Sequence, residues 1–87
     1  MKTEEKFTHL SRQVQNEPEK VKEEAEQLLK KGKEKNDHHV MFNSYLLLSD
    51  VYSHQGNYQS AEEELKQAMM LAKADNNQQQ LPNFQKI

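Results

Sequence analysis

The sequence predicts an all-α protein in which antiparallel helix pairs follow one another along the chain. Apolar residues recur at i, i+3 or i+4, and i+7, a spacing that places them on one face of an α-helix. The first such stripe consists of Tyr45, Leu48 and Tyr52. A second stripe follows after a short turn and consists of Ala61, Leu65 and Ala68. Because only a turn separates the two stripes, we expect the two helices to pack against each other.

Small residues at the turn and in the stripes support this helix pair. Gly56 can take the positive φ that commonly closes a helix. Ser49 on the first helix and Ala61 on the second are small enough to let the two backbones approach closely. We therefore expect a closely packed hairpin of two helices.

A weaker copy of the pair precedes the clear one. Its first stripe, Phe7, Leu10 and Val14, lies 38 residues before the stripe that begins at Tyr45. Its second helix begins at Pro18, a residue favoured in the first helical turn. That helix carries the stripe Val21, Ala25, Leu28 and Leu29, in which Ala25 precedes Ala61 by 36 residues. The expected helices are therefore about Thr3–Gln15, Pro18–Lys35, Val40–His54 and Tyr58–Ala74.

These helices suggest one helical-repeat domain over residues 1–87, with units at about 3–37 and 38–75. Residues 76–87 carry Leu81, Phe84 and Ile87, whose spacing is that of another helix face. We interpret this segment as a cap or as the start of a truncated third unit.

The residues of the clear unit, in this order, resemble the tetratricopeptide repeat. The resemblance rests on Tyr45, Leu48, Ser49, Tyr52, Gly56, Tyr58, Ala61, Leu65 and Ala68. It is close over about residues 39–74 and degenerate over about residues 3–35. Tyr45 stands where Trp is commonest, and Lys73 stands near a position where many units carry Pro, which suggests the longer-unit branch. The resemblance implies a short right-handed solenoid of about four helices with a C-terminal stub or cap.

The resemblance also implies which side chains pack between helices and which bind a partner. The packing positions are Phe7, Leu10, Val14, Ala25, Leu29, Tyr45, Leu48, Ser49, Tyr52, Gly56, Tyr58, Ala61, Leu65 and Ala68. The first helix of each unit would line a concave face, formed by Glu5, Thr8, Arg12, Gln15, Asn43, Leu46, Asp50, Ser53 and His54. On this face Arg12 and Asp50 would orient a peptide by charge, Asn43 would bond to its backbone, and Leu46 would bury an apolar anchor.

Composition argues against several other functions. The chain has no cysteine, which excludes disulfides and thiolate zinc sites. No segment approaches the ~20 apolar residues of a membrane span, so we expect a cytoplasmic protein without membrane contact. The lysines between Lys30 and Lys35 are interrupted by Glu34 and lack interleaved aromatic residues, so nucleic-acid binding is not expected.

Motifs for catalysis are also missing from the sequence. It contains no glycine-rich phosphate loop and no nucleophile elbow. His38 and His39 are adjacent and diverge by ~100° on a helix, with no third ligand at a suitable spacing, so we expect no metal and no cofactor. Glu62, Glu63 and Glu64 are interpreted as a solvated helix face.

Two functional hypotheses remain from the sequence. The first is a non-catalytic module that binds a protein or peptide, similar to repeat units fused to bacterial signalling proteins, and therefore a regulatory or sensory fragment. The alternative is a self-assembly element that forms a homodimer through exposed repeat faces.

Overall fold

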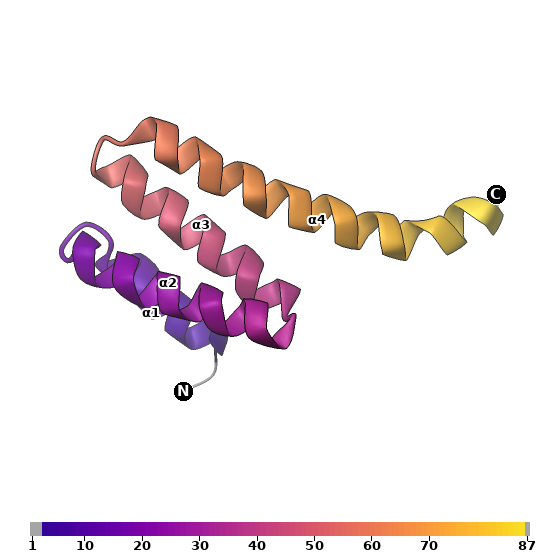
Figure 1. Ribbon diagram of the computed structural model, residues 1–87, viewed down its shortest axis with the longest axis horizontal. Helices are drawn as coiled ribbons and strands as arrows, with labels where there is room; N and C mark the ends of the chain where they lie inside the picture. The colour runs from indigo at the N-terminus through magenta and orange to yellow at the C-terminus, as the bar shows by residue number, and fades with distance from the viewer. Residues whose placement is uncertain (1–2, 87) are drawn as a thin grey trace.

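A computed structural model describes the backbone of residues 3–86 and the side chains of residues 5–74. Over this range the chain forms helices only, with no β-strand: α1 (Thr3–Gln13), α2 (Pro18–Lys35), α3 (His38–His54) and α4 (Tyr58–Lys86) (Figure 1). The prediction of an all-α fold with four helices is therefore confirmed.

Helix α3 is the centre of the molecule. It contacts each of the other three helices, and α1 also contacts α2. Figure 1 shows α4 on one side of α3 and the α1–α2 pair on the other, with α4 extending well past the end of α3. Among the residues placed in the structure, α4 contacts α3 alone.

The main core lies between α1, α2 and α3. It consists of Phe7, Leu10, Val14, Val21, Ala25, Leu47, Leu48 and Val51, all of which are buried. Leu28, Leu29, Val40 and Tyr52 are partly buried and pack against it. Each fully buried large apolar side chain contributes about 1.5–3 kcal/mol. The stripes predicted on the first three helices, apart from Tyr45, thus form one continuous core.

The contact between α3 and α4 uses small side chains. Ala61 and Ala68 are buried on α4, and because α4 contacts only α3, it is α3 that covers them. Tyr45 is buried on α3 outside the main cluster. Ser44 is also fully buried, and its hydroxyl donates a hydrogen bond of 2.7 Å to the carbonyl oxygen of Val40. The buried hydroxyl is therefore satisfied within its own helix.

The connection from α2 to α3 differs from the prediction by two residues. Asn36 ends α2 in the left-handed conformation, with φ 54°. Helix α3 begins at His38 rather than Val40, because the side chain of Asp37 accepts a hydrogen bond of 3.3 Å from the backbone N–H of Val40. Asp is a favoured residue at this capping position, so the sequence contained a signal for the earlier start.

Helix α1 ends at Gln13, two residues before the predicted end. The backbone N–H of Glu17 donates to the carbonyl oxygen of Gln13 at 2.8 Å and closes a turn. The following Pro18 disfavours helical geometry in the residue before it, and Glu17 indeed has φ −136° and ψ 63°. Val14 lies in this turn and is still buried.

Helix α4 continues to Lys86, so the predicted end at Ala74 is wrong. The residue that ends α2 is Asn36, which takes the left-handed conformation readily, whereas its counterpart 38 residues later is Ala74, the strongest helix former. The chain therefore lacks the stop signal at this point. The proposed capping side chains of Leu81, Phe84 and Ile87 lie outside the described residues.

Three other packing predictions need correction. Gly56 is exposed, and a Cβ atom there would meet nothing within 4 Å, so it does not pack between helices. Tyr58 is 70% exposed and Leu65 is 41% exposed, although both were expected between helices. Tyr58 is the first residue of α4, and Leu65 lies ~40° around the helix from Ala61, on a side that no other described helix covers. The predicted positive φ of Gly56 is confirmed at 79°.

None of the described helices is both long enough and apolar enough to cross a membrane.

Candidate binding groove

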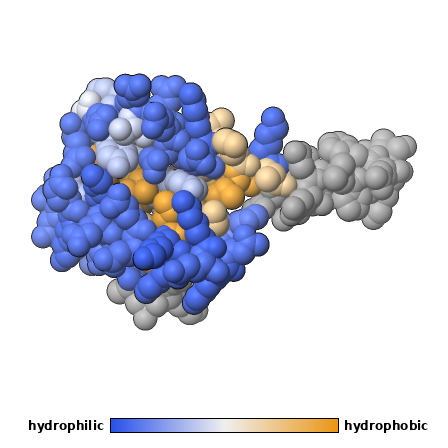
Figure 2. All heavy atoms as spheres, in the orientation of Figure 1, coloured by the Kyte–Doolittle hydropathy of each residue, from blue (hydrophilic) through white to orange (hydrophobic). Residues whose placement is uncertain are grey.

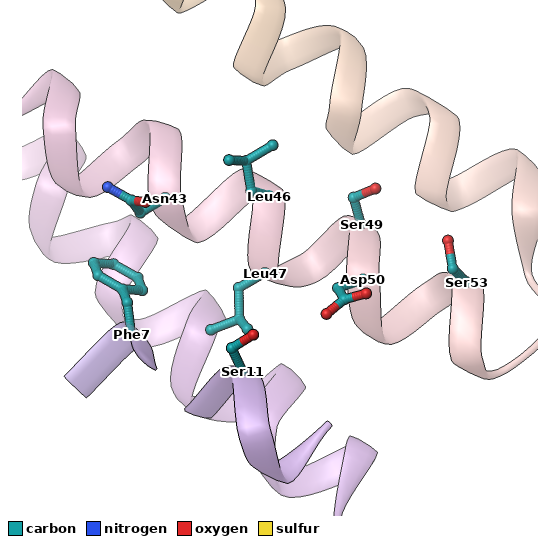
Figure 3. A pocket seen from close by; sticks show the side chains of 8 residues that line it. All are labelled: Phe7, Ser11, Asn43, Leu46, Leu47, Ser49, Asp50 and Ser53. Carbon is teal, nitrogen blue, oxygen red and sulfur yellow. The ribbon is translucent and has the colours of Figure 1, made fainter. Parts of the chain in front are cut away.

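A groove of about 330 Å³ lies between α1 and α3. Its lining side chains are Phe7 and Ser11 from α1, and Asn43, Leu46, Leu47, Ser49, Asp50 and Ser53 from α3. Figure 3 shows Leu47 and Asp50 pointing toward α1, and Leu46 and Ser49 pointing away from it. The α3 contribution recurs every three or four residues along a single helix, because one face of the helix borders the groove throughout.

The groove combines an apolar floor with a polar rim. Phe7 and Leu47 belong to the buried core and keep only 8% and 5% of their surface exposed. Leu46 is 36% exposed and supplies apolar surface at the edge. Three serine hydroxyls, from Ser11, Ser49 and Ser53, surround this surface and can donate or accept hydrogen bonds. Such a mixture of apolar and polar groups is typical of a ligand site.

A second hollow of about 240 Å³ lies beside the first and is lined by Phe7, Thr8, His39 and Asn43. The two hollows share Phe7 and Asn43. They therefore adjoin at these two residues, and together they extend along α3 toward its N-terminus.

Asp50 is the only charged side chain among the residues that line the larger hollow. Its Oδ1 lies 3.8 Å from the Nε2 atom of His54, one helical turn later. Both side chains are well exposed, so the pair contributes little to stability. The carboxylate gives the groove a negative character that favours a basic ligand group.

The amide of Asn43 is already engaged within its helix. Its Nδ2 atom donates a hydrogen bond of 2.9 Å to the carbonyl oxygen of His39 and lies 3.4 Å from the Nε2 atom of the His39 ring. The Asn43 side-chain oxygen is therefore the atom that can bind a ligand, by accepting a hydrogen bond. A peptide N–H group is the matching donor.

The expected binding residues are only partly brought together. Asn43, Leu46 and Asp50 line the larger hollow, as does Ser53 from the predicted concave face, and Thr8 lines the smaller hollow. Arg12 and His54 line neither, and the same holds for Glu5 and Gln15. Arg12 and Asp50, which were expected to orient a peptide by their opposite charges, therefore do not line the same hollow, and the role of Arg12 in binding stays a prediction.

On α1, the predicted concave face and the residues that line the two hollows agree at Thr8 and differ one turn later. The core stripe here is Phe7, Leu10 and Val14. Measured from Phe7, Ser11 lies ~40° around the helix, whereas Arg12 lies ~140° around it. Both side chains are exposed, but only Ser11 lies on the flank that borders the larger hollow. The helical period contained this signal, since Ser11 is one turn after Phe7.

The side chains of Asp50 and His54 beside the groove do not form a hydrogen-bonded pair. The separation of 3.8 Å between Asp50 and His54 exceeds hydrogen-bond distance, so the carboxylate does not orient the imidazole as in a Ser-His-Asp triad. Within residues 5–74, no three side chains from His, Asp or Glu come together as metal ligands would.

Comparison of the chain with models of known protein families, with curated proteins and with solved structures finds no match. The resemblance to the tetratricopeptide repeat stays a prediction from the residues that carry it.

Proposed function

We propose that this chain is a non-catalytic protein-interaction module that binds a short peptide segment of a partner in the groove between α1 and α3. The observation that carries the proposal is the elongated groove, in which an apolar floor lies next to a single carboxylate. A groove of this shape accommodates an extended segment better than a compact small molecule.

The lining residues define the chemistry of the peptide. An apolar side chain would be buried against Phe7, Leu46 and Leu47, and such an anchor supplies most of the affinity in a small interface. A Lys or Arg side chain next to the anchor would pair with Asp50. The Asn43 oxygen would accept a hydrogen bond from a peptide N–H group.

The proposed scaffold is a tetratricopeptide-like array of two units. It is supported by the resemblance over about residues 39–74, and by the packing of α3 against the preceding helix pair. In this reading the rigid helices present the groove and undergo no chemistry. By analogy with repeat units in signalling proteins, we propose that the chain acts as a regulatory fragment. The cytoplasmic location stays a prediction.

The test is a binding titration with peptides that place one Leu beside one Arg. We expect Asp50→Asn to weaken binding by about 1 kcal/mol, or roughly fivefold, as for a partly exposed ion pair. The Asn43→Ala and Asp50→Ala double variant should weaken it further, while the melting temperature stays nearly unchanged. Glu23→Gln is the matched control, because Glu23 is an exposed acid on α2 that lines neither hollow.

The peptide provides a second control. Replacing its Arg by Gln should reduce binding to the wild type, and should have little effect on binding to Asp50→Asn. Equal affinity of all variants for the original peptide would exclude this groove as the binding site.

The alternative function, self-assembly, is favoured by a different observation, the exposed apolar surface of α4.

A further inference from the structure

Helix α4 exposes a row of apolar side chains that no other described helix covers. Tyr58, Leu65 and Met69 are spaced at i, i+7 and i+11 and lie within ~40° of one another around the helix. We call them the α4 stripe. Their side chains are 70%, 41% and 62% exposed. Figure 2 shows hydrophobic atoms at the surface next to the grey C-terminal segment, where α4 leaves the rest of the bundle.

Two of the three corresponding positions of α2 are charged rather than apolar. Ala25 precedes Ala61 by 36 residues, and both are buried. By the same offset, Tyr58 corresponds to Lys22 and Met69 corresponds to Lys33. The α2 helix therefore carries charged side chains where α4 carries exposed apolar ones.

The middle position of the stripe differs in another way. Leu65 corresponds to Leu29, which packs against the main core. In the first unit this leucine is covered, because α3 packs on α2. On α4 the equivalent leucine has no covering helix among the described residues. An additional helix on this side of α4 would cover Leu65 in the way that α3 covers Leu29, which is partly buried.

The charges beside the stripe identify the helix that fits there. Glu62 and Lys73 lie on the same flank of the stripe, at ~40° and ~60° from Tyr58. In an antiparallel pair of identical helices, residues on the same flank meet across the interface. When Leu65 of one copy is opposite Met69 of the other, Glu62 comes beside Lys73 of the second copy. In a parallel pair the same flanks lie on opposite edges of the interface, so Glu62 of one copy and Lys73 of the other would not meet.

We propose that two copies of this chain associate through their α4 stripes, with the two α4 helices antiparallel about a twofold axis that crosses the stripe midway between Leu65 and Met69. The contact is isologous, so the packing of Leu65 from one copy against Met69 from the other occurs twice in the interface. The stripe is short, and interfaces below about 1,200 Å² are weak or transient. We therefore expect a dissociation constant of the dimer in the micromolar range. The inference goes beyond peptide binding and does not depend on it, since no α4 residue lines the groove.

The first test is sedimentation velocity of the full chain between about 1 and about 300 μM, the range in which a micromolar dimer forms. The wild type should shift from monomer to dimer. Met69→Lys, which introduces the residue found at the α2 counterpart, should raise the dissociation constant at least tenfold. Gln67→Lys is the matched control, because Gln67 is exposed on the opposite side of α4 and the charge change is the same.

The second test concerns orientation. Glu62→Lys alone should weaken the dimer, and the Glu62→Lys and Lys73→Glu double variant should restore it. The single variant also breaks an exposed pair of 3.5 Å with Lys66, which matters little for folding, and circular dichroism checks that helicity is kept. Any one of three results would overturn the proposal. The wild type could stay monomeric at all concentrations, Met69→Lys and Gln67→Lys could weaken the dimer equally, or the double variant could fail to restore it.

Discussion

The close approach of α2 and α3 at Gly32 makes a quantitative prediction about packing. A Cβ atom at Gly32 would lie 3.0 Å from Cγ of Met41, 3.1 Å from Cγ1 of Val40 and 3.3 Å from the backbone nitrogen of Met41. All three distances are tighter than ordinary van der Waals contact, and one of the atoms belongs to the backbone of α3. Neither the branched Val40 side chain nor the backbone can move away easily.

Gly32→Ala therefore combines two opposing effects. Replacing Gly by Ala within a helix favours folding by about 1 kcal/mol at most, whereas overpacking a close contact costs about 1–3 kcal/mol. We expect a net loss of about 1 kcal/mol and a decrease in melting temperature of about 4–8 °C for a domain of this size.

The assay is thermal unfolding followed by circular dichroism. Met41→Ala removes the side-chain atom nearest to the new Cβ. In that background Gly32→Ala should therefore reduce the free energy of unfolding by less than it does in the wild type. This double-mutant cycle separates the contact from the helix propensity. A higher melting temperature for Gly32→Ala in the wild-type background would show that α2 and α3 do not approach each other as closely as described.

Two further predictions concern α4. Ala61→Leu should destabilise the fold by about 1–3 kcal/mol, because Ala61 is only 6% exposed and a larger side chain would overpack the contact with α3. Glu63→Leu is the control, because Glu63 is exposed and its replacement should leave the melting temperature nearly unchanged. An unchanged melting temperature for Ala61→Leu would contradict the pairing of α3 with α4. Burial, together with the negative charges of Glu63 and Glu26, raises the pKa of Glu64 above its usual value of 4.5, although Lys33 opposes the shift. A raised pKa means that the folded state disfavours the charged form, so the stabilising contribution exists below pH 4.5 and is lost as the pH rises through the folded-state pKa. Glu64→Gln should therefore raise the melting temperature at pH 7 and not at pH 4. Glu62→Gln is the control at an exposed position. An equal effect of Glu64→Gln at both pH values would contradict this explanation.

The helices and most of the core could be predicted because both depend on local spacing. Phe7, Leu10 and Val14 pack as their i, i+3 and i+7 positions require, and Gly56 takes the positive φ expected of a glycine after a helix. Periodicity needs no knowledge of what lies across the interface. It identifies the buried face of each helix before any contact is known.

The errors occur where a neighbouring helix decides the outcome. Leu65 has the spacing of a core residue but is exposed, because no described helix lies on its side of α4. Arg12 was predicted on the concave face, whereas Ser11 lines the groove, because the flank of α1 that borders α3 depends on how the two helices pack. Periodicity assigns a residue to a face, and only the tertiary arrangement determines which flank of that face another helix covers.

The two proposed surfaces can be tested independently because they use different helices. The groove is lined by α1 and α3, and the α4 stripe lies on α4 alone. Asp50→Asn should therefore leave the monomer–dimer equilibrium unchanged, and Met69→Lys should leave the affinity for a single peptide unchanged. A dimer would carry two grooves, and a partner with two suitably spaced peptide segments would bind it more tightly than a monomer without any additional contact in either groove. Loss of this gain in Met69→Lys, with unaltered binding of the single peptide, would show that dimerisation acts through avidity rather than by completing the groove.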